Sequence, residues 1–137
     1  AKKHSSDIVF SDMYQAYSME EFQNTTRFLE QCWQLLTADG WLVINFHHLP
    51  EFDHPYMERM CDLFPEVLCC RTNGGNYVVM CGKQKLAQPL PEYRDSLAEL
   101  EQRFDIRLYT NFARIFKLST PVTDSVKLSR QPGLESR

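Results

Sequence analysis

Several features that define common function classes are absent from this 137-residue sequence. No run of apolar residues approaches the roughly 18 that are needed to cross a bilayer. Residues 1–4 lead directly into a short strand-like run, so we expect no signal peptide. The formal net charge of -3 argues against a general nucleic-acid-binding protein, which would carry a basic patch. We therefore expect a cytoplasmic protein that binds neither membranes nor nucleic acid.

The cysteines lack the spacing of a metal or redox motif. There are five of them, an odd number, and no Cys-x-x-Cys pair occurs: Cys32, Cys61, Cys69, Cys70 and Cys81. Because most of them lie in apolar segments, we expect buried or partly buried reduced thiols of a cytosolic protein. The odd number leaves a regulatory or intermolecular disulfide as the alternative.

Length and composition allow one ordinary domain with a moderate core. The hydrophobic fraction of 43% is that of a folded soluble protein. Changes in pattern along the chain predict three parts. Residues 1–84 form an α/β domain, residues 85–118 a helical extension, and residues 119–137, which contain prolines and several serines, a weakly ordered tail.

Two short apolar runs predict buried strands. The first, Asp7–Asp12, ends in a polar residue. The second, Trp41–Phe46, is apolar on both faces, as expected for a parallel strand that is covered by helices.

Between these strands, residues 19–37 show apolar residues at helical spacing. Ser18 is a suitable N-cap, and Glu21 lies three residues on, as in a capping box. Gly40 is suited to a left-handed conformation just after the helix, so we expect the helix to end there.

The pattern continues with a second helix and a hairpin. Pro55 fits the first turn of a helix that runs to about Phe64. Residues 66–72 and 77–82 read as strands, and the Asn-Gly-Gly-Asn sequence at 73–76 is a strong turn signal. Two right-handed crossovers should therefore give three parallel strands, and the last strand should run antiparallel.

Beyond the hairpin the pattern is weaker. Residues 92–104 predict an amphipathic helix with Tyr93, Leu97 and Leu100 near one face. Residues 106–118 are apolar and are ambiguous between strand and helix.

The order and spacing of four segments resemble a known family. They are the predicted strand Asp7–Asp12, the segment Leu36–Asn45 after the first helix, the segment Met60–Val67, which contains a Phe-Pro-x-Val motif, and Val79–Lys83 at the end of the hairpin. Together they look like the C-terminal half of a class I methyltransferase-type fold and are most similar to spermidine synthases and spermidine-synthase-like proteins. The resemblance covers residues 6–84. It implies a Rossmann-like sheet of the family's fourth, fifth, seventh and sixth strands, side by side, with the last strand of the chain antiparallel.

The resemblance also implies site residues. Asp12 matches the first Asp of the family's aminopropyltransferase motif, which acts as base toward the substrate amine, or it anchors the cofactor's amino group. Tyr14 would line the cofactor site, and Gln15 and His47 the substrate site. The implied cofactor is S-adenosylmethionine or its decarboxylated form, and a small-molecule amine or another acceptor receives an aminopropyl or methyl group. A loop Asp that caps the following turn is the simpler alternative for Asp12, and a plain loop role is the alternative for Tyr14 and for Gln15. His47 is placed at the site because strand ends converge there, and a polar loop residue is its alternative.

The sequence departs from the family in three places. Gln15 stands where the family has its second Asp, and Thr72–Asn76 stands where the family has a Tyr-Pro-Ser-Gly loop. Both changes remove groups that would hold a polycation, which argues against true polyamine synthesis. The glycine-rich cofactor loop, which would lie in the other half of such a fold, is absent from the sequence. We therefore expect this part to be inactive alone.

One further hypothesis, a non-catalytic interaction module, stays open beside the enzyme. A half sheet would expose the Asp7–Asp12 strand as an edge, which favours an interaction module that forms a homodimer or a strand-swapped pair. The polar cluster His47, His48, Asp53 and His54 follows a strand, and we interpret it as a loop and not as a metal site, because adjacent side chains on an extended chain point to opposite sides.

Overall fold

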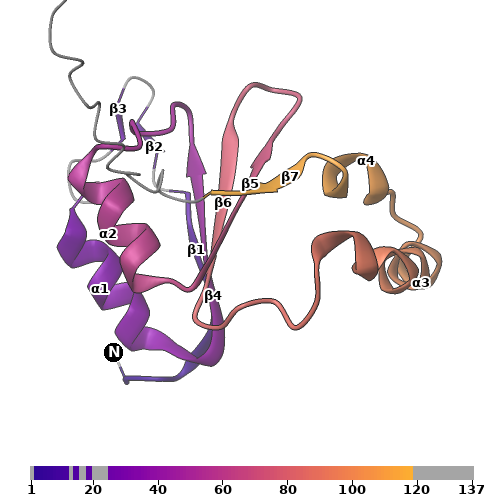
Figure 1. Cartoon of the computed structure of the whole chain (residues 1–137), viewed down its shortest axis with the longest axis horizontal. Coiled ribbons are helices and arrows are strands. Elements are labelled where there is room, and N and C mark those ends of the chain that lie inside the picture. The colour runs from indigo at the N-terminus through magenta and orange to yellow at the C-terminus, as the bar shows by residue number, and fades with distance from the viewer. Residues whose placement is uncertain (1, 13, 16–17, 20–24, 119–137) are drawn as a thin grey trace, which may run out of the picture.

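The computed structural model describes residues 2–12, 14–15, 18–19 and 25–118. Its main feature is a five-stranded sheet in the order β1-β4-β6-β5-β7 (Figure 1). The strands are β1 (Ser6–Ser11), β4 (Leu36–Phe46), β5 (Glu66–Arg71), β6 (Tyr77–Gly82) and β7 (Ile115–Lys117). A separate antiparallel pair consists of β2 (Tyr14–Gln15) and β3 (Ser18–Met19).

The strand directions make this a mixed sheet. β1 pairs parallel with β4, whereas β6 pairs antiparallel with both β4 and β5. β1, β4 and β5 therefore share one direction, and β5 and β6 form the expected hairpin. The predicted α/β class is confirmed, because helices flank this sheet.

Two helices cover one face of the sheet. These are α1 (Thr26–Leu35) and α2 (Pro55–Leu63), which lie side by side in Figure 1. Both belong to crossovers that progress in the same direction across the sheet, and right-handed crossovers then place their helices on the same face. The imidazole Nδ1 of His54 caps α2 by accepting the Tyr56 N–H at 3.2 Å.

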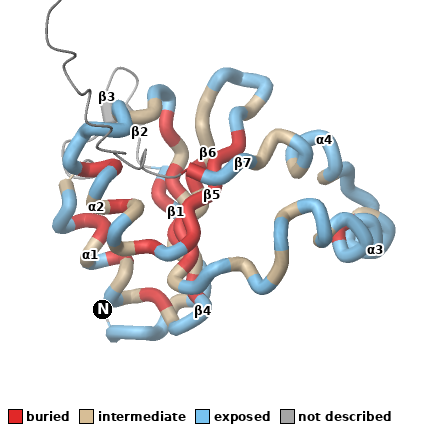
Figure 2. The backbone as a smooth tube through the Cα atoms, viewed as in Figure 1, coloured by how far each residue is buried: buried red, intermediate tan, exposed pale blue. Residues whose placement is uncertain are grey.

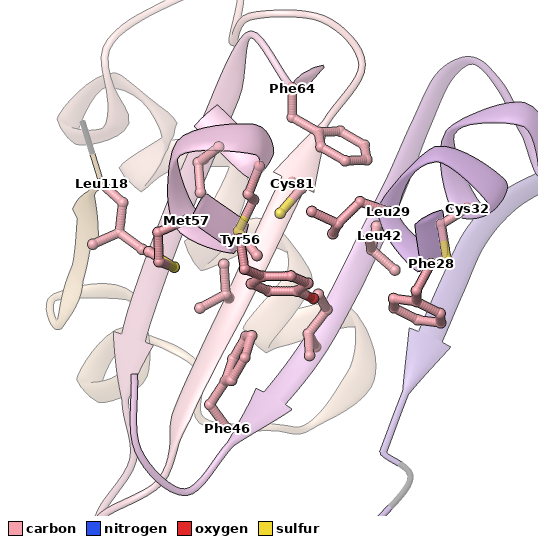
Figure 3. Close-up of a cluster of buried hydrophobic side chains, with 14 of the residues drawn as sticks. Phe28, Leu29, Cys32, Leu42, Phe46, Tyr56, Met57, Phe64, Cys81 and Leu118 are labelled. Carbon is pink, nitrogen blue, oxygen red and sulfur yellow. The ribbon is translucent and has the colours of Figure 1, made fainter. Parts of the chain in front are cut away.

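The core fills the space between this face and the two helices (Figure 2). Alternate residues of β4, namely Leu42, Ile44 and Phe46, point into it and are fully buried. Leu29 of α1 and Tyr56 of α2 meet them from the helix side, as Figure 3 shows. The other alternate residues of β4 point to the opposite face of the sheet, which we call the open face.

The predicted start of the first helix is wrong. α1 begins after Thr25, whose hydroxyl accepts the Phe28 N–H at 3.2 Å, and Ser18 lies in β3. Glu21, the expected partner in a capping box, lies outside the described residues. Thr25, seven residues further along the chain, therefore caps the helix in place of the predicted Ser18.

The predicted end of this helix is also wrong. α1 stops at Leu35, and residues 36–40 extend β4. Gly40 does not adopt the left-handed conformation, because the positive-φ residues of the described chain are His4, Asp105 and Gly75. Glycine is required at position 40 for space, since a Cβ there would lie 2.9 Å from the Cβ of Leu36.

The region after the hairpin contains helices and a strand. The 3₁₀ helix η1 (Leu90–Tyr93), α3 (Arg94–Phe104) and α4 (Tyr109–Phe112) lie to one side of the sheet, and β7 then pairs antiparallel with β5 (Figure 1). The ambiguous segment 106–118 thus holds a short helix and a short strand. The tail that we predicted for residues 119–137 lies outside the described residues.

A buried carboxylate joins β7 to the rest of the sheet. The side chain of Glu66 forms an ion pair with Lys117 Nζ at 2.8 Å and accepts the Leu86 N–H at 2.9 Å. Burial by itself raises the pKa of Glu66, but these hydrogen bonds and the charge of Lys117 outweigh burial and lower it. Glu66 is therefore ionised in the folded protein at neutral pH.

Among the described residues, no disulfide joins any of the five cysteines, which agrees with the predicted reduced thiols. Burial raises the pKa of Cys32 and of Cys69 to about 11 and the pKa of Cys81 well above its ordinary value. These thiols are therefore protonated at neutral pH and unreactive as nucleophiles. Within the described residues, no helix is long and apolar enough to span a membrane.

Candidate functional site

Three polar side chains meet where β1 and β4 end and β6 begins. Asn45 Nδ2 donates to Asp12 Oδ1 at 2.9 Å, and Asn76 Nδ2 donates to Asn45 Oδ1 at 3.2 Å. The strand register explains this meeting, since Ser11 pairs with Ile44, and Asn45 pairs with Val78. Asn45 orients the carboxylate of Asp12, and Asn76 orients the amide of Asn45. Among the described residues, no side chain donates a hydrogen bond to the second carboxylate oxygen, Oδ2.

This polar row borders a cavity of about 370 Å³ on the open face. Its lining includes Asp12, Asn45 and Asn76 together with the apolar residues Phe10, Val43 and Val78. A carboxylate beside apolar walls suits a ligand that carries an amine on a hydrocarbon chain. The position agrees with the rule that open α/β sheets bind ligands at the carboxyl ends of their parallel strands.

The sequence identified one residue of this site and missed two. Asp12 lines the cavity, and the role that the sequence predicts for it stays a prediction. We had interpreted Asn45 as an ordinary strand residue and Asn76 as a turn residue. The available signal was a single amide in the otherwise apolar strand Trp41–Phe46, at a position where the alternation places it on the open face.

The other predicted site residues are not among the described residues that line this cavity. The backbones of Tyr14 and Gln15 form β2, and their side chains lie outside the description, so their roles stay predictions. His47 is exposed just after β4 and is not among the residues that line the cavity. Its role as a substrate ligand also stays a prediction.

One histidine of the loop after β4, His54, has a structural role. His54 caps α2, as described above. Across the described parts of the chain, no three side chains of His, Cys, Asp or Glu lie close enough together to hold a metal ion.

The cavity fits part of an adenosylmethionine-type cofactor but not the whole of it. Asp12 Oδ2 can accept a hydrogen bond from an amino group, and the apolar walls can contact a short carbon chain. Binding a nucleoside also requires donors and acceptors for the ribose hydroxyls and the base. The carboxylate and the two amides of the row already bond to one another, and Ser11 and Thr72 are the further polar residues of the described lining. The described lining is therefore too small a set of polar groups for a whole nucleoside.

Comparison with known proteins gives a limited result. No family model matches the sequence, and no curated protein matches it significantly. Among solved structures, the chain is similar to the crystal structure of a probable spermidine synthase from Corynebacterium glutamicum ATCC 13032, with a TM-score of 0.49 and 19% identity. The similarity covers 62% of this chain and 34% of that chain, so it spans about a third of the synthase. At this level it assigns no activity, and the residues of the cavity must carry any functional assignment.

Proposed function

We propose that this chain forms the acceptor-binding part of a spermidine-synthase-like transferase, in which Asp12 accepts a proton from an amine that receives an aminopropyl or methyl group. The observation that carries the proposal is the row Asp12–Asn45–Asn76 above a cavity with apolar walls. The group would come from S-adenosylmethionine or its decarboxylated form. The family resemblance of residues 6–84 supports the same assignment.

The geometry explains what Asp12 would do. A protonated amine is not a nucleophile, so a base must remove its proton before or during attack. Asn45 donates to one carboxylate oxygen of Asp12, and the second oxygen, Oδ2, would accept that proton from an amine in the cavity. Asn76 fixes the amide of Asn45 in turn, so Asn45 and Asn76 are positioning residues.

The edge of the sheet supports the further proposal that the cofactor is held by structure outside this chain. β1 is an edge strand, and its open-face residues Ile8 and Phe10 are 52% and 73% exposed. Strands that pair with this edge would complete the sheet and cover both side chains. We accordingly propose that the chain is inactive alone.

The proposed acceptor is not a polyamine. Gln15 replaces a family carboxylate, and the turn Thr72–Asn76 contains no acidic residue. A polycation needs several carboxylates, and among the described lining residues Asp12 supplies the single one.

The proposed amine site is tested by titration of a small primary monoamine, n-propylamine, with detection of the Asn45 side-chain amide by nuclear magnetic resonance. We expect saturable shifts of this amide, and an affinity about tenfold lower in Asp12→Asn, because that change removes a charged acceptor. Asp7→Asn is the matched control, since Asp7 also lies on β1 and accepts a hydrogen bond from a β4 side chain, Thr37, at 3.0 Å. Equal losses in both variants would contradict the assignment.

A second candidate is a non-catalytic module that forms a homodimer or a strand-swapped pair. The exposed Ile8 and Phe10 on the β1 edge favour it, because apolar edge strands recruit other strands. Light scattering over a range of concentrations tests it. A monodisperse monomer at high concentration would exclude it, and a dimer that Phe10→Lys dissociates would support it.

A further inference from the structure

A second cavity lies at the tip of the β5–β6 hairpin. Its volume is about 500 Å³, and Arg71, Thr72, Asn73, Gly75 and Arg114 line it. Two of the five are arginines that come from distant parts of the sequence. The hairpin between β5 and β6 and the segment that enters β7 therefore build the cavity together. Figure 1 shows where these backbone segments lie.

The β5–β7 pairing brings the two arginines to the same end of the strand pair. The last pair at that end is Cys70 with Ile115, and Arg71 and Arg114 are the residues next to these two. Both arginines line the cavity, so the fold holds two positively charged side chains at one place.

Within the part of the chain that the structure describes, these two arginines contact neutral groups. The Cζ atom of Arg71 lies 5.8 Å from the ring centroid of Tyr77, and Arg114 donates a hydrogen bond to the Asn73 side-chain oxygen. The ion pairs found between described residues involve other cations, Arg59 and Lys117. The positive charge of the cavity is therefore oriented but not neutralised by the described part of the protein.

We propose that this cavity binds the anionic group of a small-molecule ligand, a carboxylate or a phosphate. Guanidinium groups present several N–H donors in a plane and bind such oxyanions with paired hydrogen bonds. The Thr72 hydroxyl and the Asn73 amide add neutral donors at the same place. An oxyanion between Arg71 and Arg114 would also remove the repulsion between them.

Thr72 connects this cavity to the first one, since it lines both. A ligand whose oxyanion lies at the arginines is therefore adjacent to the cavity that holds Asp12. If the proposed function holds, this ligand is the acceptor, and the acceptor carries both an amine and an anionic group. Two arginines would repel a polyamine, which agrees with the proposed exclusion of polycations.

The test is titration of the protein with inorganic phosphate and, separately, with acetate at constant ionic strength, observed by calorimetry and by the arginine side-chain resonances. We expect saturable binding of at least one of the two anions. Arg71→Gln and Arg114→Gln should each lower the affinity about tenfold, because each removes one charged donor group. Arg94→Gln, on exposed α3, is the matched control for loss of one positive charge and should change the affinity less than about twofold.

Each outcome decides the proposal. Tighter phosphate binding identifies a phosphate ligand, and equal or tighter acetate binding identifies a carboxylate ligand. No saturable binding of either anion overturns the proposal, and so does an equal loss in Arg94→Gln. If Arg114→Gln does not fold, Arg71→Gln decides, because Arg71 is exposed. Phosphate binding that persists while n-propylamine fails to bind near Asp12 would reject the proposed function and leave the anion site intact.

Discussion

The two faces of the sheet differ although the same strands build both. The covered face packs Leu42, Ile44 and Phe46 against α1 and α2 without exposure to solvent. The open face presents Phe10 of β1 to solvent and carries the Asp12–Asn45–Asn76 row. Strand alternation alone separates the two sets of residues. The covered face therefore accounts for stability, and the open face is where ligand binding has to be sought.

Matched phenylalanines give the largest test of this difference. Phe46 is fully buried on the covered face, so Phe46→Ala should lower the free energy of unfolding by about 3–5 kcal/mol, because it leaves a cavity in the core. The side chain of Phe10 is 73% exposed on the open face, so Phe10→Ala should change the free energy of unfolding by less than about 0.5 kcal/mol. Urea unfolding of both variants measures this. Comparable losses would show that the open face is covered in solution, as in a dimer.

The second test concerns Glu66, which is 2% exposed and ionised within the sheet. Glu66→Gln should lower the free energy of unfolding at neutral pH by about 1–3 kcal/mol, because it removes a charged acceptor for Lys117 and for the Leu86 N–H. The control is Glu30→Gln, which breaks the exposed pair with Arg59 and should cost less than about 1 kcal/mol.

The pH dependence of this contribution has a defined sign. The pKa of Glu66 is lower in the folded protein than its ordinary value of 4.5, so the unfolded chain binds the proton first as the pH falls. The stabilisation is complete above the ordinary value and is lost between that value and the lower folded pKa. Urea unfolding at several pH values should show that the difference between wild type and Glu66→Gln shrinks over this acidic range. A difference that stays constant with pH would contradict the assignment.

The sequence predicted the parts of the fold that depend on local pattern. Apolar runs and the Asn-Gly-Gly-Asn turn identified β1, β4, β5 and β6 and the hairpin, because period and turn chemistry are local properties. The predicted positions of both ends of the first helix were wrong, for reasons that the local sequence pattern does not contain. Thr25 competes with Ser18 as a cap, and Gly40 serves a close contact with Leu36 and not a left-handed turn.

Which residues meet at the candidate sites depends on strand register, and the pattern of apolar and polar residues in the sequence does not specify that register. Asp12 was found because it ends a strand. Its partners are Asn45 of β4 and Asn76, which directly precedes β6, and the pairing of β1, β4 and β6 brings them to Asp12. The two arginines were harder to predict, because Arg114 directly precedes β7 and this strand lies in a segment that was ambiguous between helix and strand.

The smallest expected effect concerns a buried hydroxyl group on the covered face. Tyr56 is 1% exposed, and its hydroxyl has no hydrogen-bond partner among the described residues. Burial of an unpaired hydroxyl costs free energy, and burial also raises the pKa of Tyr56, so the group stays neutral. Tyr56→Phe keeps the ring and its edge contact with Phe46, at 6.3 Å between centroids, and removes the unpaired oxygen. We therefore expect Tyr56→Phe to raise the free energy of unfolding by up to about 1 kcal/mol.

Urea unfolding measures this change, and Tyr77→Phe on β6 is the control, since Tyr77 is half-buried and its substitution should have an effect below about 0.5 kcal/mol. A loss of about 1 kcal/mol or more in Tyr56→Phe would show that the hydroxyl is bonded in solution. The covered face would then contain a polar contact that matters for stability, and the contrast between an apolar covered face and a polar open face would be weaker than the described contacts indicate.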